Sequence, residues 1–171
     1  MCPDTEMGRL VRDHDWAATS LGHPDQWAPG LRAAVSMVMS SQFPMLVVWG
    51  PALAKIYNDG YRPLLGSKHA AALGAPVAEV WSEIWDTIGP LFDQVIHTGR
   101  STWMEHQSLA VERNGFLEEA FFTYSYSALY DEQGRIGGVL DVVAETTREV
   151  VSLARLGAAL QLNEALMGAR E

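Results

Sequence analysis

Cysteine and basic residues are both scarce in this chain. Cys2 is the single cysteine of the 171 residues, so no intramolecular disulfide can form and a reducing compartment is favoured. Lys and Arg number 12 against 21 Asp and Glu, which gives a formal net charge of -9. Such a field repels phosphates, and no basic stripe reverses it locally. We therefore expect neither nucleic acid nor an anionic membrane as a partner.

Long apolar runs are missing as well. The longest strongly apolar stretch, Met45 to Trp49, is far shorter than the roughly 20 residues that span a bilayer. Residues 1–16 mix charged residues with isolated apolar ones and lack the continuous apolar core of a secretory signal. These absences predict a cytoplasmic protein without membrane insertion.

Motifs for catalysis and metal binding are also missing. The sequence contains no Gly-rich phosphate loop, zinc-ligand spacing, nucleophile elbow or autophosphorylation motif. Glu79 and Glu83 are four residues apart and could share a helix face, but they alternate with an apolar stripe. We expect them on the wet face of that helix, without the burial that a catalytic carboxylate needs. We predict no catalytic residue and no metal site.

What is present is typical of one soluble globular domain. The apolar fraction is 48% and the charged fraction 19%, and the length suffices for a core with short flanking helices. Helical spacing is found at 9–21, 31–41 and 77–98, the last with a break expected at Gly89-Pro90. Strand signals cover 45–49, 53–57, 102–111, 116–130 and 136–144.

This order predicts an α+β domain whose antiparallel sheet is built from two separated groups of strands. Short helical segments are expected up to about residue 73, and the chain is helical again from Glu149. The strand at 136–144 is apolar on both faces, which predicts a central position in the sheet.

Several stretches, in their order and spacing, resemble a bacterial PAS subgroup found at the front of sensor histidine kinases and related signalling proteins. The resemblance runs from Trp16 to Arg148. The subgroup has alanine at the position of Gly60 and proline at that of Ala128, and both differences affect local backbone. The matching residues are Val48-Trp49-Gly50-Pro51, Tyr57-Asn58-Asp59-Gly60-Tyr61, Leu64-Leu65-Gly66, Lys68-His69, Leu73-Gly74, Pro76, Glu79-Val80-Trp81, Glu83-Ile84-Trp85, Ile88-Gly89-Pro90 and Phe122-Thr123-Tyr124-Ser125-Tyr126-Ser127.

The resemblance implies a PAS fold: a five-stranded antiparallel sheet in the order 2-1-5-4-3, with a helical insert on one face that encloses a small-molecule cavity. It divides the chain into a flanking helical segment at 1–41, a sensor domain at 42–148 and a C-terminal amphipathic signalling helix at 149–171. That helix would begin the linker to an effector domain.

Candidate ligand-binding residues follow from this arrangement. Strand alternation puts Phe122, Tyr124 and Tyr126 on one face of the sheet, but does not say which face lines the cavity. Asn58 has the alternative role of a turn residue and helix cap. The candidates are Tyr57, Asn58, Trp81, Trp85, His97, Met104, His106, Tyr124 and Tyr126.

No cofactor is indicated by these residues. His97, near the end of its helix, is a single histidine without a recognisable haem-pocket pattern, which disfavours haem. Cysteinyl-flavin photochemistry needs a cysteine on the helical insert, a place that Cys2 cannot occupy. The ligand is therefore an unidentified small molecule.

The C-terminal helix carries Leu153, Leu156, Leu160 and Met167 at heptad spacing, with Asn163 at a seam position. This spacing predicts a homodimer. The leading hypothesis is a sensor and dimerisation domain of a bacterial signal-transduction protein, with a histidine kinase as the first candidate. One alternative is a ligand-free interaction module whose own aromatic residues fill the cavity. Another is a small α+β enzyme, such as an isomerase, which would need a buried carboxylate or histidine with a shifted pKa.

Overall fold

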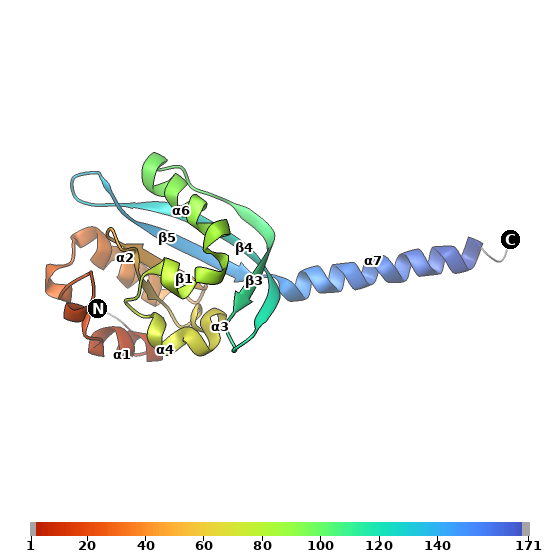
Figure 1. Ribbon diagram of the computed structural model, residues 1–171, viewed down its shortest axis with the longest axis horizontal. Coiled ribbons are helices and arrows are strands. Elements are labelled where there is room, and N and C mark those ends of the chain that lie inside the picture. Colours follow the sequence, from red (N-terminus) through yellow and green to blue (C-terminus); the bar gives the residue numbers. More distant parts are fainter. Residues whose placement is uncertain (1–2, 169–171) are drawn as a thin grey trace.

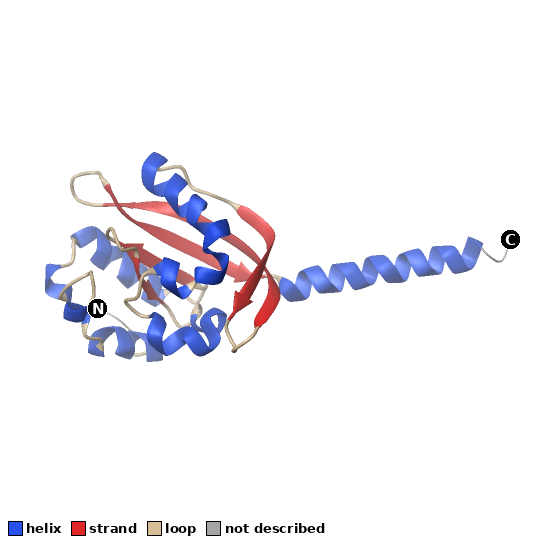
Figure 2. Ribbon diagram, viewed as in Figure 1, coloured by secondary structure: helices blue, strands red, loops and turns tan. Residues whose placement is uncertain are grey.

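The computed structural model describes residues 3–168, and Cys2 lies outside them. Its centre is one five-stranded sheet in the order β2-β1-β5-β4-β3, in which every neighbouring pair is antiparallel (Figures 1 and 2). This confirms both the α+β class and the strand order. The strands are β1 (Met45–Trp49), β2 (Ala54–Tyr57), β3 (Met104–Glu112), β4 (Leu117–Tyr130) and β5 (Ile136–Glu145).

The pairing of β1 with β5 joins the two groups of strands into one sheet. Val47 pairs with Leu140 and Val48 with Val139, so β5 lies between β1 and β4 as its apolar composition predicts. A charged residue, Asp141, nevertheless stands in the middle of this central strand.

The helical insert between β2 and β3 covers one face of the sheet (Figure 1). It consists of short pieces followed by one longer helix. They are α3 (Arg62–Leu65), the 3₁₀ turn η3 (Gly66–Lys68), α4 (His69–Ala72), α5 (Val77–Val80), the 3₁₀ turn η4 (Ser82–Ile84) and α6 (Trp85–Thr98).

The N-terminal helices are α1 (Glu6–Asp13) and α2 (Pro29–Ser40), with the 3₁₀ turns η1 (Trp16–Ala18) and η2 (Pro24–Gln26) between them. The single lead-in helix expected at 9–21 is therefore wrong, since α1 ends at Asp13. Helix α2 packs on the sheet face opposite the insert, where a Cβ on Gly30 would lie 3.4 Å from the Trp49 ring.

The break expected at Gly89-Pro90 is also wrong. Helix α6 runs through Pro90, and the insert is interrupted at Trp81, whose φ of -112° and ψ of 37° are not helical. Pro90 removes one helix hydrogen bond and costs about 3 kcal/mol. The burial of Ile88, Phe92 and Val95 on the same helix offsets this cost, at about 1.5–3 kcal/mol for each large apolar side chain.

Glu83 does not lie on a wet face as expected. Its carboxylate is 2.6 Å from Lys68 Nζ and accepts a hydrogen bond from Glu112 N at 2.9 Å. The interruption at Trp81 turns Glu83 toward these partners. The Lys68 ammonium and the amide donors outweigh desolvation and lower the pKa of Glu83.

The C-terminal helix α7 (Thr147–Gly168) extends away from the body of the domain (Figure 1). Residues 151–167 are all exposed. Among residues 3–168, no helix combines the length and the apolar character that a membrane span requires.

Candidate functional site

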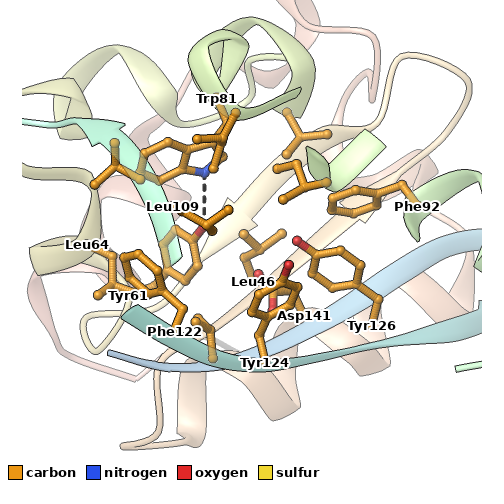
Figure 3. A pocket seen from close by; sticks show the side chains of 15 residues that line it. Leu46, Tyr61, Leu64, Trp81, Phe92, Leu109, Phe122, Tyr124, Tyr126 and Asp141 are labelled. Carbon is orange, nitrogen blue, oxygen red and sulfur yellow. Dashed lines mark hydrogen bonds between the residues drawn. The ribbon is translucent and has the colours of Figure 1, made fainter. Parts of the chain in front are cut away.

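A small cavity lies between the sheet and the helical insert (Figure 3). Its volume is about 40 Å³, and its walls are mostly aromatic and aliphatic. Pockets for drug-sized ligands measure roughly 300–1,000 Å³, so a haem or flavin ring system does not fit within these walls. The lining residues are Leu46, Tyr61, Leu64, Val77, Trp81, Ile84, Ile88, Phe92, Leu109, Val111, Phe122, Tyr124, Tyr126, Asp141 and Val143.

The sheet register explains which side chains face this cavity. Asp141 pairs with Leu46 on β1 and with Tyr126 on β4, and residues directly opposite each other share a face. Tyr124 pairs with Val143, two residues farther along, and so points the same way. The face that carries Phe122, Tyr124 and Tyr126 is therefore the cavity face, which the sequence left open.

Asp141 is the one carboxylate in the cavity wall of the described chain. Its side chain points from β5 into the interior beside Tyr124 and Tyr126 (Figure 3). The residue is 5% exposed, and its Oδ1 has no hydrogen-bond partner. Burial raises the pKa of Asp141 to about 8, and the positive charge of Lys55 opposes this shift only in part.

Lys55 is the second buried charge on this face. It pairs with Val48, two residues from Leu46, and it is 0% exposed. Its Nζ lies 5.7, 5.2 and 5.3 Å from the ring centroids of Tyr57, Tyr61 and Trp81, within the range of cation–π attraction.

None of these rings gives the ammonium a conventional hydrogen bond, and Lys55 Nζ has no partner. Burial lowers the pKa of Lys55 to about 7, against the opposing influence of Asp141. A lysine and an aspartate are thus buried on one sheet face without direct pairing.

A tyrosine hydroxyl completes the unpaired polar groups of the cavity. Tyr124 Oη is buried and has no hydrogen-bond partner. Burial, with the negative charge of Asp141 as the second cause, raises the pKa of Tyr124 to about 12. The Tyr61 hydroxyl differs, since it accepts a hydrogen bond from Trp81 Nε1 at 3.1 Å (Figure 3).

Three of the residues selected from the sequence line the cavity, namely Trp81, Tyr124 and Tyr126. Tyr57 and Trp85 lie outside its lining. The Tyr57 hydroxyl donates to the backbone oxygen of His69 at 2.5 Å, and the Trp85 ring stacks on Phe92 at 5.7 Å.

The side chain of Asn58 faces backbone groups and not the cavity. It is 1% exposed and has five backbone groups within hydrogen-bond distance, so both its oxygen and its two N–H groups are occupied. Its Oδ1 accepts from Met45 N and Tyr61 N, both at 3.1 Å, and its Nδ2 lies 3.1, 3.0 and 2.7 Å from the carbonyl oxygens of Val38, Ser41 and Phe43.

The remaining candidates lie away from the cavity. His97 is exposed, with Nδ1 2.8 Å from the Asp93 carbonyl oxygen one turn earlier in α6. His106 is exposed on β3, with Nδ1 2.9 Å from Thr146 Oγ1, and Met104 is half-buried at the start of that strand. In residues 3–168, no cluster of three His, Cys, Asp or Glu side chains could hold a metal ion.

Lys55 and Asp141 were missed in the sequence analysis. Both interrupt otherwise apolar strands, between Ala54 and Ile56 and between Leu140 and Val142. The signal that could have identified them is a charged residue in the middle of an apolar strand. Lys and Asp are almost never fully buried, so their presence in such a strand is unusual and points to a special role.

Comparison with known proteins agrees with this architecture. The family model described as PAS fold matches residues 46–151, which is more than half of the chain. The chain therefore belongs to the PAS family, and the PAS domain is a sensory fold.

Solved structures share the fold at low identity. The PAS domain of a Colwellia psychrerythraea protein is similar with a TM-score of 0.52 and 15% identity, over 69% of this chain and 98% of that one. The phage VqmA–DPO complex has a TM-score of 0.54 and 17% identity, over 76% of this chain and 59% of that one. The Rhodobacter sphaeroides LOV protein has a TM-score of 0.55 and 12% identity, over 70% of this chain and 68% of that one. At these identities the likeness shows the fold alone.

One curated relative is a Streptomyces coelicolor protein named histidinol-phosphatase, 34% identical over 103 residues. The match covers 59% of this chain and 34% of that protein, so the chain spans about a third of the relative's length. The activity of the whole relative does not follow for this chain from such a match.

Proposed function

We propose that this chain is the cytoplasmic sensor and dimerisation domain of a bacterial signal-transduction protein, with a histidine kinase as the leading candidate. A small molecule binds in the cavity, and the effector is controlled through α7. One observation carries the proposal: β5 places Asp141 in the cavity wall and leads, after the single residue Thr146, into the exposed helix α7. A ligand that favours one arrangement of the sheet would shift the population of α7 orientations.

A half-buried arginine, Arg113, supports this route from the sheet to α7. The Arg113 guanidinium lies 2.7 and 2.9 Å from the two carboxylate oxygens of Glu145, the last residue of β5, and also bonds Glu118. The Arg113 carbonyl oxygen accepts hydrogen bonds from Ser67 N and Oγ at 2.6 and 2.9 Å. Glu145 in turn accepts from Thr147 Oγ1 at 3.1 Å. Arg113 thus joins the insert, the β3–β4 hairpin and the base of α7.

Replacing Arg113 by methionine should loosen the base of α7 while the sheet stays folded, because the bidentate pair with Glu145 is lost. Amide hydrogen exchange at residues 145–150 should accelerate about tenfold or more. Arg135→Met is the matched control, since Arg135 is a surface arginine whose partner is Asp131 in the β4–β5 turn. Equal exchange rates at residues 145–150 in both variants would contradict the proposed route.

The exposed face of α7 supports self-association. Leu153, Leu156, Leu160 and Met167 are 64%, 59%, 56% and 64% exposed and follow the 3-4 spacing of a coiled-coil seam. Asn163 continues that spacing, and a polar residue at one seam position favours a single register. A second copy of α7 would remove these side chains from water.

Charge on the seam should therefore abolish the dimer. The triple variant Leu153→Glu, Leu156→Glu, Leu160→Glu should sediment as a monomer at concentrations where the unaltered chain is a dimer. The triple variant Ala154→Glu, Ala158→Glu, Ala165→Glu adds the same charge to the opposite side of the helix and should remain dimeric. Analytical ultracentrifugation measures both, and unchanged sedimentation of the seam variant would refute the pairing through α7.

A second candidate function is the ligand-free interaction module, favoured by the small volume of the cavity and its aromatic filling. Retention of a small molecule by the purified protein, measured by native mass spectrometry, supports the sensor; an empty protein that still dimerises supports the module. The enzyme alternative finds its required buried carboxylate in Asp141, but no histidine or second carboxylate accompanies it among the described lining residues.

A further inference from the structure

Three buried polar atoms of the cavity region lack partners: Lys55 Nζ, Asp141 Oδ1 and Tyr124 Oη. Burying such groups unpaired is unfavourable, and it is most unfavourable for the two ionisable ones. Their positions on neighbouring strands of one face follow from the register of β2, β1, β5 and β4. A ligand that pairs with these three atoms would supply the hydrogen bonds and charge interactions that they lack in the folded chain.

We infer that the cavity binds a small zwitterion of amino-acid size. The ammonium group of the ligand meets the Asp141 carboxylate and the Tyr124 hydroxyl, and its carboxylate faces the Lys55 ammonium. This inference rests on the proposed sensor function and adds the chemical class of the ligand. Lys55 does not itself line the cavity, but its Nζ lies 5.2 and 5.3 Å from the ring centroids of Tyr61 and Trp81, which do, and it would meet the ligand between these two rings.

The charge pattern favours a zwitterion over simpler ligands. A cation alone would pair with Asp141 and leave the Lys55 ammonium without an anion. An anion alone would leave Asp141 buried and unpaired. An apolar molecule would leave all three polar atoms unsatisfied.

The volume of the cavity and its aromatic lining also favour a small zwitterion. A cavity of about 40 Å³ holds only a few non-hydrogen atoms or a small number of waters. The aromatic rings of Trp81, Phe92 and Tyr126 suit a compact ammonium group, because their faces are electron-rich. Glycine and L-alanine combine this size with both charges.

The test uses the full chain and four probes at equal ionic strength: glycine, L-alanine, methylammonium and acetate. Binding is followed by NMR through the backbone amides of β5 and the Trp81 indole N–H. We expect glycine or L-alanine to bind about tenfold more tightly than methylammonium or acetate, since only the zwitterions satisfy both charges. No binding of either amino acid, or equal binding of methylammonium or acetate, overturns the inference.

The variants Lys55→Met and Asp141→Asn should each weaken glycine binding about tenfold or more, and Asp86→Asn, at an exposed position of α6, should not. If a single variant folds poorly, Lys55→Met with Asp141→Leu replaces it, because removing both charges avoids an orphaned one. Retained glycine binding in that double variant overturns the inference.

Native mass spectrometry of the purified protein separates the two proposals. A retained molecule of another class overturns the zwitterion but leaves the sensor function standing. A protein that carries no molecule, binds none of the four probes and still dimerises through α7 overturns both ligand proposals and leaves the interaction module.

Discussion

Replacing Asn58 by alanine should lower the free energy of unfolding by about 3–5 kcal/mol, because several buried backbone groups lose their partners at once. The Asn58 side chain accepts from two amides, and its two N–H groups are shared among three carbonyl oxygens that lie between α2, β1 and the start of the insert. Alanine fills none of these positions, and a residue that is 1% exposed leaves little room for water to substitute. Urea unfolding followed by tryptophan fluorescence measures the loss.

Two neighbouring changes show whether the hydrogen bonds are responsible. Asn58→Asp keeps the acceptor but places a carboxylate oxygen against the three carbonyl oxygens in place of the donors, so it should be destabilised at least as much as the alanine variant. Asp59→Ala removes the one hydrogen bond that Asp59 Oδ1 accepts from Met7 N, at 3.1 Å, and should cost about 1 kcal/mol. A loss for Asn58→Ala no larger than that for Asp59→Ala would show that the Asn58 bonds contribute little to stability.

Asn58 also shows how local and long-range signals differ. The turn chemistry after the second strand is readable in the sequence, since Asn58-Asp59-Gly60 is a typical strand-ending tripeptide. The partners of its side chain are not, because Val38, Ser41 and Phe43 meet it only when α2 packs beside β1 and β2. A local motif indicates the backbone conformation correctly and carries no information on the tertiary contacts.

The sheet is predictable because its signals are local and mutually consistent. Simple alternation along the strand at 116–130 separates Tyr124 and Tyr126 from Ser125 and Ser127, and the resemblance supplies the strand order. The insert is harder to predict. Whether its longest helix continues through Pro90 depends on the cost of the proline and on the stabilisation gained by burying apolar side chains against the sheet. That burial depends on the surface of the sheet, which the local sequence of the helix does not contain.

The cavity itself could be anticipated only in part. Trp81, Tyr124 and Tyr126, which the sequence offers as ligand-binding candidates, do line the cavity, whereas Lys55 and Asp141 are not among those candidates. The composition of the chain does not distinguish Lys55 and Asp141 from other charged residues. What distinguishes them is their position, since each is a charged residue in a strand whose neighbouring residues are largely buried. In the sequence, this position is visible only as an exception to the apolar pattern of the strand.

Removing both charges together should stabilise the protein. The variant Lys55→Met with Asp141→Leu replaces two buried ionisable groups that lack partners by apolar side chains of similar length and should gain about 2–4 kcal/mol at neutral pH. The single variants should gain less or lose stability, because each leaves the other charge buried alone. Urea unfolding of the three variants and the unaltered chain, at equal ionic strength, gives the comparison.

The pH dependence of that gain identifies its cause. The pKa of Asp141 is raised to about 8, so its favourable contribution, full below the ordinary carboxyl pKa, is lost as the pH rises toward 8. The pKa of Lys55 is lowered to about 7, so its contribution, full above the ordinary lysine pKa, is lost as the pH falls toward 7. The unaltered chain is therefore penalised most between about pH 7 and 8.

The advantage of the double variant should accordingly be greatest in that window and should shrink by about 2 kcal/mol toward either pH 5 or pH 10, at up to about 1.4 kcal/mol per pH unit for each group. Lys68 and Glu83, which also act on Lys55, are present in both proteins, so their titration largely cancels in the difference. An advantage that is constant across this range would mean that packing, and not the burial of two charges, separates the variants. A maximum near neutral pH ties the stability of the sheet to the same two groups that we assign to the ligand.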